Sequence, residues 1–150
     1  MNEFEREHAI RTIVTRIAHT IDARQWSELR RLYADEVETD YTSLFGGDVQ
    51  HQKGDDLIEA WRRMLTPLTA TQHLVGPIEV RVRGERAAAD CHVRGYHILD
   101  GQQGSAEWMV AGHWAIELVE NAGMWKITKM TLQTFYQTGE KDLLQRAPPG

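Results

Sequence analysis

The spacing of apolar residues changes near the middle of the chain, and this change constrains the fold more than any other feature of the sequence. Between residues 10 and 21 the apolar positions follow the three-and-four spacing of an amphipathic helix, at Ile10, Ile13, Val14, Ile17, Ala18 and Ile21. From residue 71 to residue 136 the chain instead forms long β-like segments separated by tight turns. Helices followed by a run of strands are typical of an α+β fold.

The first half of the chain predicts two more helices and one short strand. The second helix is expected from Trp26 to Tyr33, and a short strand from Val37 to Thr42. Acidic residues after Gly54 favour the start of a third helix, which ends before Pro67. The apolar residues of this third helix are Leu57, Ile58, Trp61, Met64 and Leu65.

The second half predicts four long strands in an antiparallel meander. They cover residues 71–82, 86–99, 105–119 and 125–136, and a bend is expected at Gly76-Pro77. Turns are expected at 83–85, 100–104 and 121–123. We expect this sheet to curl around the first helix as a cone with a pocket at its open end. Residues 1–150 then form a single domain, with 138–150 as a C-terminal tail.

Charge and hydropathy narrow the classes of partner. The net charge is −5 and the basic residues form no stripe, which argues against nucleic acid as a partner. No apolar run approaches the ~20 residues that span a bilayer, which argues against a membrane protein. The charged N-terminus lacks the pattern of a signal peptide, so a cytoplasmic location is expected. The single cysteine, Cys91, is expected to be a small core residue.

Asp22 is the first candidate for chemistry. It falls at the C-terminal end of the first helix, beside the apolar stripe, where the helix dipole disfavours a negative charge. An aspartate there has no capping role. Two interpretations remain open from the residues alone: a functional carboxylate, or a solvated aspartate that opens the loop Asp22-Ala23-Arg24.

Histidines supply the second group of candidates. His73 stands at the start of a strand, and its ordinary pKa suits proton transfer near neutral pH. It could equally be a core histidine bonded to a backbone carbonyl. His97 shares strand parity with Cys91 and Val93, which places it on the inward face, whereas His92 has the opposite parity.

Aromatic and sulphur-containing residues complete the candidate pocket. The Tyr41 phenol could polarise an oxygen of a ligand, or it could fill a core position with its hydroxyl bonded. We assign Trp26, Trp61 and Met109 to the walls of a pocket for a small apolar or aromatic molecule. The histidines lack the local spacing of a metal site, so neither a metal nor a cofactor is expected.

The strand over residues 105–119 also predicts self-association. Its large residues Trp108, Val110, Trp114 and Ile116 share one parity, which we assign to the outer face of the sheet. An apolar patch of that size on the surface marks an interface. A homo-dimer or homo-trimer is therefore expected.

Taken together, the motifs resemble the SnoaL-like branch of the NTF2-like superfamily over residues 10–137. Within that branch the chain is most similar to the scytalone dehydratases, and it also resembles the hexachlorocyclohexane dehydrochlorinases. The similarity is carried by Ile21-Asp22, Trp26, Thr39-Asp40-Tyr41, Thr71-Gln72-His73 and Gly123-Met124-Trp125-Lys126-Ile127.

The resemblance implies a cystatin-like cone of curved antiparallel sheet and three helices. It also implies a cofactor-independent lyase. His73 would remove a proton, Asp22 would hold its ring, and Tyr41 would polarise a substrate oxygen. His97 would either act as a general acid on the leaving hydroxyl or share the contact with Asp22. Isomerases, polyketide cyclases, dehydrohalogenases and non-catalytic modules, such as the small subunits of ring-hydroxylating oxygenases, have the same fold and remain alternatives.

The chain departs from the scytalone dehydratase pattern at three positions. Gly112 and Trp114 replace a pocket serine and asparagine, and Ile21 replaces a tyrosine. The resemblance therefore implies a more apolar pocket and a substrate other than scytalone itself.

Overall fold

The computed structural model describes residues 1–101 and 104–148, so part of the turn expected at 100–104 and the last two residues of the expected tail lie outside it. The helices are α1 (Glu3–Asp22), α2 (Trp26–Arg31), α3 (Thr42–Phe45), α4 (Gly54–Leu65) and α5 (Leu143–Arg146). The strands are β1 (Tyr33–Asp40), β2 (Gln50–Lys53), β3 (Ala70–Arg83), β4 (Arg86–Gly101), β5 (Gly104–Asn121) and β6 (Met124–Gly139). The expected α+β fold is confirmed.

The six described strands form one curved sheet in the order β2-β1-β6-β5-β4-β3. The meander from β3 to β6 is antiparallel, as expected, and the register shifts between Val75 and Ile78, on either side of the predicted bend. The exception is β1, which pairs with β6 in parallel. The segment 41–123 connects these two strands, and a long connection permits a parallel pair.

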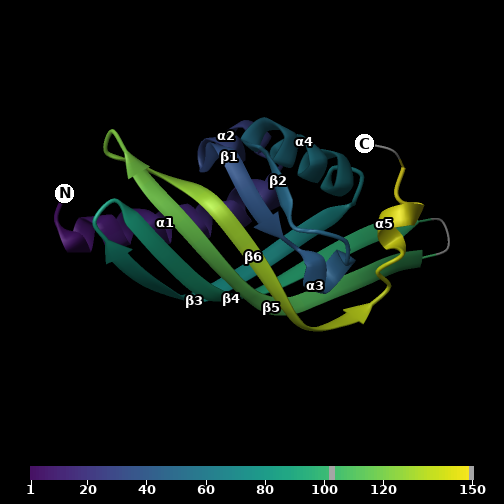
Figure 1. Ribbon diagram of the computed structural model, residues 1–150. Coiled ribbons are helices and arrows are strands. Elements are labelled where there is room, and N and C mark those ends of the chain that lie inside the picture. The colour runs from purple at the N-terminus through teal and green to yellow at the C-terminus, as the bar shows by residue number, and fades with distance from the viewer. Residues whose placement is uncertain (102–103, 149–150) are drawn as a thin grey trace.

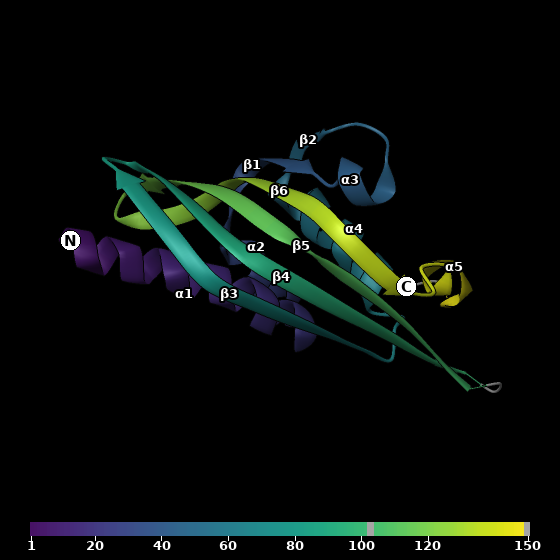
Figure 2. The ribbon, with the colours of Figure 1, turned by 90° about the horizontal axis from the view of Figure 1, so that it is seen from below.

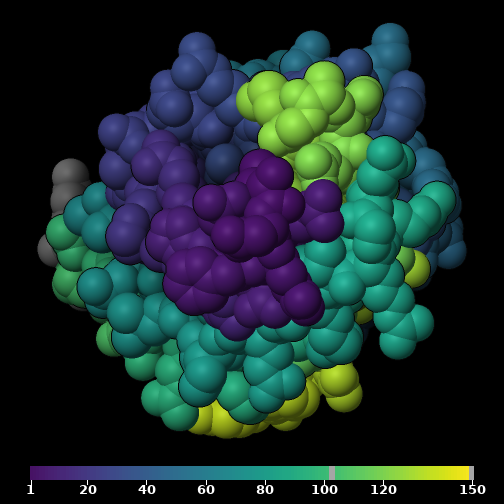
Figure 3. All heavy atoms as spheres, turned by 90° about the vertical axis from the view of Figure 1, so that its left-hand side faces the viewer, coloured from purple at the N-terminus to yellow at the C-terminus, as the bar shows by residue number. Residues whose placement is uncertain are grey.

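Helix α1 packs along β3 and forms the main contact between helices and sheet (Figures 1 and 2). It starts with a capping box, in which the Asn2 and Glu5 side chains each accept from the other's backbone N–H. Its predicted apolar stripe is buried at Ile10, Val14, Ile17, Ala18 and Ile21. At the closed end of the cone, the first turns of α1 lie beside the β5–β6 hairpin, which is yellow-green in Figure 3. Helix α1 thus carries Asp22 from the closed end of the cone into its interior.

Three predicted boundaries are wrong. Tyr33 begins β1 instead of ending α2, because its side chain is buried in the core. Tyr41 lies just after β1, at the N-cap of α3. Residues 138–148 are not a free tail, since β6 runs to Gly139 and α5 buries Leu143 completely. A single apolar pair in a short charged segment gives too weak a period to predict this helix.

The predicted outer face of β5 is also wrong. Trp108, Val110, Trp114 and Ile116 point inward and are all buried, whereas Met109 points to the opposite face. Strand β5 is apolar on both faces around residues 108–112, so alternation does not identify its inward side there. An error of one residue in parity exchanges every side chain between the two faces.

No helix in the described ranges combines the length and the apolar content that crossing a bilayer requires.

Candidate active site

A cavity opens between the inner face of the sheet and the helices, toward the end of the cone that carries α3. It encloses about 580 Å³ of free space when its open mouth is included. Most of its wall is aliphatic or aromatic, from Ile21, Leu44, Phe45, Trp61, Met64, Leu65, Val93, Val110, Trp108, Trp114 and Leu132. Polar side chains enter this wall at three positions, His73, His97 and Tyr41. The cavity therefore suits a mainly apolar ligand with few oxygen atoms.

Asp22 forms a hydrogen-bonded pair with His73, which lines the cavity. The His73 Nδ1 atom lies 2.8 Å from Asp22 Oδ1, and the His73 backbone N–H donates to Asp22 Oδ2 at 2.7 Å. A carboxylate only accepts, so Nδ1 carries the proton. In the neutral imidazole, Nε2 is then the basic nitrogen. The side chains are only 11% and 21% exposed, for His73 and Asp22 respectively.

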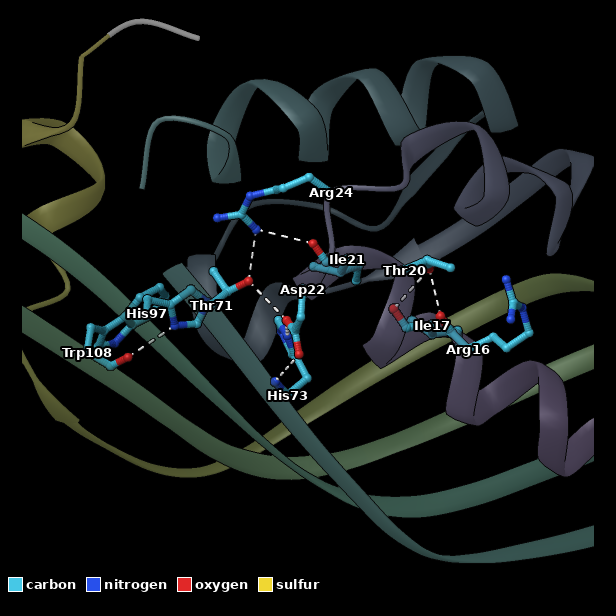
Figure 4. A network of polar contacts seen from close by, with 10 residues as sticks. All are labelled: Arg16, Ile17, Thr20, Ile21, Asp22, Arg24, Thr71, His73, His97 and Trp108. Atoms are coloured by element: carbon cyan, nitrogen blue, oxygen red, sulfur yellow. Dashed lines mark hydrogen bonds and ion pairs between the residues drawn. The ribbon is translucent and has the colours of Figure 1, made fainter. Parts of the chain in front are cut away.

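A chain of hydrogen bonds from Arg24 through Thr71 reaches the Asp22 carboxylate (Figure 4). The Thr71 hydroxyl donates to Asp22 Oδ1 at 3.0 Å. The Arg24 guanidinium donates to Thr71 Oγ1 at 2.9 Å and to the Ile21 carbonyl at 3.2 Å. Arg24 has a left-handed backbone with φ of 59°, which costs a non-glycine residue about 1–2 kcal/mol. The chain thus accepts local strain just after α1, next to the pair.

The environment keeps Asp22 ionised. Burial raises the pKa of the Asp22 carboxyl, but the hydrogen bonds and charge of His73 outweigh it, so the pKa lies below its usual value. The negative charge also stands at the C-terminal end of α1, where the helix dipole disfavours it. Three N–H and O–H donors compensate for this position. Such a carboxylate can stabilise a positive charge on His73.

His97 lies beside His73 on the same wall of the cavity, and the two rings meet edge to face with centroids 5.9 Å apart. Its Nδ1 lies 3.1 Å from the Trp108 carbonyl, which only accepts, so Nδ1 carries the proton. Burial, with a smaller effect from His73, lowers the pKa of His97 to about 4. His97 is therefore neutral near pH 7, with an unprotonated Nε2. The unprotonated Nε2 of His97 is a hydrogen-bond acceptor, which disagrees with the expected role of His97 as a general acid. Its Nδ1–H donates to the Trp108 carbonyl, which disagrees with the expected contact between His97 and Asp22.

Tyr41 retains its phenolic proton. Burial raises the pKa of Tyr41 above its usual value, and a weaker opposing effect comes from Trp114. The hydroxyl contacts Met130 Sδ at 4.0 Å, and thioether sulphur is a weak acceptor. The phenol is thus available to donate to a ligand oxygen.

Of the three predicted pocket residues, the structure brings one to the cavity. Trp61 lies in the wall, where its ring packs against Tyr41 at 6.2 Å between centroids. Trp26 and Met109 lie outside it: Trp26 starts α2 and packs against the core, and Met109 is on the far face of β5. The sequence-based parity of β5 accounts for the error at Met109.

Sequence reasoning missed two residues that shape the position of His73. Trp114 stacks on the His73 ring at 6.2 Å between centroids, with 21° between the planes. Gly95 lies opposite His73 in the β3–β4 register, and a Cβ there would stand 3.2 Å from His73 Nε2. A glycine inside a strand is the sequence signal for such a close approach.

Two of the three departures from the scytalone dehydratase pattern have a structural basis. At Gly112 a Cβ would collide with the backbone carbonyl of Gln133 in β6, so the fold leaves no room for a side chain. Ile21 lines the cavity as an apolar residue. Among the described residues, no three His, Cys, Asp or Glu side chains come together as a metal site.

Comparison with known proteins places the chain in a family. The model of the family described as "SnoaL-like domain" matches residues 2–131. The fold also matches the crystal structure of Kfla4162 from Kribbella flavida, with a TM-score of 0.88, 27% identity, and coverage of 97% of this chain and 100% of that one. A search of the curated proteins finds no match.

Two further structures share the fold at lower identity. One, from Novosphingobium aromaticivorans, is described as a "Putative Scytalone Dehydratase", with a TM-score of 0.77, 20% identity, and 91% and 89% of the two chains covered. The other is a hexachlorocyclohexane dehydrochlorinase, LinA Type2, with a TM-score of 0.77, 18% identity, and 91% and 90% covered.

Proposed function

Since this chain belongs to the SnoaL-like domain family of the NTF2-like fold, whose structural relatives have diverse activities, we propose that it is a cofactor-independent lyase of the dehydratase type. The observation that carries the proposal is the 2.8 Å contact of Asp22 with His73, whose ring lines an apolar cavity. Pairs of this kind prepare an imidazole to take up a proton.

In the first step, His73 removes a proton from a carbon atom next to a carbonyl group. The proton moves to Nε2, and the electron pair of the C–H bond moves onto the carbonyl oxygen as an enolate. Asp22 stabilises the imidazolium that forms, because its carboxylate already accepts a hydrogen bond from Nδ1–H. Tyr41 donates its phenolic proton as a hydrogen bond to the enolate oxygen, where charge develops.

In the second step, the enolate collapses and the C–O bond to a hydroxyl at the β-carbon breaks. The departing oxygen keeps its own hydrogen and receives the proton from His73 Nε2, so that it leaves as water and His73 returns to its neutral form. Before this step, the unprotonated Nε2 of His97 accepts a hydrogen bond from the same hydroxyl. His97 thus orients the leaving group while His73 carries the proton in both directions.

This role of His97 favours a hydroxyl over a halide as the leaving group. A neutral His97 with its proton on Nδ1 offers an acceptor at Nε2, which a hydroxyl can satisfy and a carbon-bound halogen cannot. The lining residues include no lysine or arginine to neutralise a carboxylate. The substrate class that fits is therefore a small, neutral, cyclic or aromatic β-hydroxy ketone.

The test separates proton removal from elimination. Purified protein is incubated with a panel of cyclic β-hydroxy ketones in deuterated water. NMR follows exchange at the α-carbon, and ultraviolet absorbance follows the enone product. We expect both signals, and we expect both to disappear in His73→Gln, with the fold checked by circular dichroism. Activity of His73→Gln at the wild-type level would contradict the assignment.

Other products distinguish the related reactions. Exchange with return of the proton at another carbon would make the protein an isomerase, and ring closure would make it a cyclase. Chloride release from chlorinated cyclohexanes without dehydration would make it a dehydrohalogenase. Tight binding of the ketones with neither exchange nor product would indicate a binding module.

The proposal includes self-association through the outer face of the sheet. The large apolar residues of β5 face inward, so they do not form this surface. The exposed apolar residues on the outer face are instead Leu74, Phe135 and Tyr136. A homo-dimer or homo-trimer that covers them would hide apolar surface from water. Light scattering at micromolar concentration tests this, and a monomer would contradict it.

A further inference from the structure

We propose that Arg24 is a positioning residue for the candidate active site, acting on Asp22 through the hydroxyl of Thr71. The inference rests on the proposed role of the Asp22–His73 pair. It concerns how the pair is held, and it assigns a function to a residue for which the sequence analysis gave no role.

The direction of each hydrogen bond follows from the groups involved. A guanidinium has only donors, so at the 2.9 Å contact Thr71 Oγ1 must accept from Arg24. The single hydroxyl proton of Thr71 is then free to point at Asp22 Oδ1, which lies 3.0 Å away. Without Arg24, the same hydroxyl could rotate toward another acceptor. The guanidinium therefore fixes the direction of the Thr71 hydroxyl.

The Thr71 hydroxyl in turn fixes the carboxylate. Asp22 Oδ1 accepts from Thr71 and from His73 Nδ1, while Oδ2 accepts from the His73 backbone N–H. Donors on both oxygens prevent the carboxylate from turning about its terminal bond. Thr71 and His73 are two residues apart on β3, so both donors are carried by one rigid strand. Figure 4 shows the complete chain of contacts from Arg24 to His73.

The backbone of Arg24 supports a role beyond helix capping. Arg24 also donates to the Ile21 carbonyl at 3.2 Å, and basic side chains commonly satisfy carbonyls at helix C-termini. A glycine at this left-handed position would avoid the strain, because it lacks a Cβ. The chain instead carries an arginine whose same Nη1 atom also reaches Thr71. Capping and positioning make different predictions, because Thr71→Val removes the second contact and leaves the first.

The test follows the ring N–H protons of His73 and His97 by NMR on protein with isotope-labelled histidine. Loss of one signal in His73→Gln and of the other in His97→Gln assigns them. In Thr71→Val and in Arg24→Gly we expect exchange of the His73 Nδ1–H with water to become roughly tenfold faster, as expected when a hydrogen bond to a charged group is lost. The His97 signal, held by the Trp108 carbonyl, serves as the internal reference.

Matched variants isolate the contact. Thr71→Ser keeps the hydroxyl and should preserve the wild-type exchange rate. Ala122→Gly changes the other non-glycine residue with a left-handed backbone among the described residues, in the distant β5–β6 hairpin, and should also have no effect. Because the contacts form one chain, the double variant Arg24→Gly/Thr71→Val should exchange no faster than Thr71→Val alone. Guanidinium ion, added well below denaturing concentration, should slow exchange in Arg24→Gly only.

Two results would overturn the proposal. Exchange at the wild-type rate in Arg24→Gly would mean that Thr71 and Asp22 hold their geometry unaided. Equal acceleration of the His73 and His97 signals would mean that the fold as a whole has loosened. The measurement needs no substrate, so it can succeed when the proposed dehydration fails, and it can fail when the dehydration is observed.

Discussion

The two faces of the curved sheet carry two histidine pairs of nearly equal geometry. On the inner face, His73 and His97 meet edge to face at 5.9 Å between centroids and 83° between planes. On the outer face, His92 and His113 meet in the same way at 6.3 Å and 88°. Each pair also has an aspartate beside it. Residue types and ring geometry alone therefore do not distinguish the site from the surface.

The outer aspartate is bound by an arginine directly. Asp90 Oδ2 accepts from Arg81 at 2.5 Å, and Asp90 Oδ1 lies 3.5 Å from His113 Nε2. The Arg81 side chain is 57% exposed. The carboxylate is thus bound mainly by a solvated arginine, and its contact with the histidine is longer than an ordinary hydrogen bond.

The inner aspartate is separated from its arginine by one hydroxyl. Thr71 stands between Arg24 and Asp22, so the carboxylate gives its short contact of 2.8 Å to His73. Both side chains are largely shielded from water, and the His73 ring lines a cavity. The two faces therefore differ in the order of their contacts and in burial, and not in the presence of Arg, Asp and His.

The largest difference between the two faces is expected when their aspartates are replaced and the rate of the proposed reaction is measured. Asp22→Asn leaves a neutral amide beside His73 and removes the charge that stabilises its imidazolium. We expect the rate of α-proton exchange to fall by roughly 10²–10⁴, because His73 loses most of its effect as a general base without the carboxylate that orients it. The measurement is exchange of a β-hydroxy ketone that the wild-type protein turns over.

Asp90→Asn is the control on the outer face, and its exchange rate should stay within about twofold of wild type, because its partners among the described residues, Arg81 and His113, do not line the cavity. Equal losses in both variants would remove the distinction between the faces.

The sequence predicted these faces unevenly. The period of α1 and the alternation in β4 placed Asp22 and His97 correctly, since each element has one clearly apolar side. The prediction for β5 was wrong because Met109 and Ala111, on its outer face, are as buried as their inward neighbours. Local patterns carry no information on pairs 51 residues apart, so only the family resemblance joined Asp22 to His73.

The next effect is on acid stability, and it belongs to His97. Its pKa is about 4 in the folded protein and 6.5 in the unfolded chain, so the unfolded chain binds the extra proton first. The stabilisation is complete above pH 6.5 and is lost as the pH falls toward 4. The loss amounts to about 3 kcal/mol over this window. Urea unfolding across the window measures it, and His97→Gln should show a flatter dependence than wild type.

Asp22 acts in a separate window. Its pKa is lowered in the folded protein, since the donors from His73 and Thr71 outweigh burial, so its stabilisation is present above pH 3.8 and is lost only below that value. The prediction for His97 has its own contrary outcome. If His97→Gln lost as much free energy of unfolding as wild type between pH 6.5 and pH 4, another group would titrate in that window.

A smaller effect is expected at Gly95. In Gly95→Ala the new methyl group would stand 3.2 Å from the His73 ring, which Asp22 and Trp114 prevent from moving freely. We expect the exchange rate to fall about tenfold, as small misplacements of a reacting group reduce rate steeply. Gly101→Ala in the same strand is the control, since its Cβ would make only an ordinary contact with Gly104. Unchanged exchange in Gly95→Ala would mean that the ring has room to shift.

The smallest effect is expected from the outer charges themselves. Asp90→Asn removes both the ion pair with Arg81 and the long contact with His113. Because Arg81 is solvated, the pair already competes with water, and the free energy of unfolding should change by less than about 1 kcal/mol. Urea unfolding at neutral pH measures this change. If the loss were several kcal/mol, Asp90 would be held by the fold as firmly as Asp22, and the outer pair would need a buried partner, such as a second copy of the chain, to explain it.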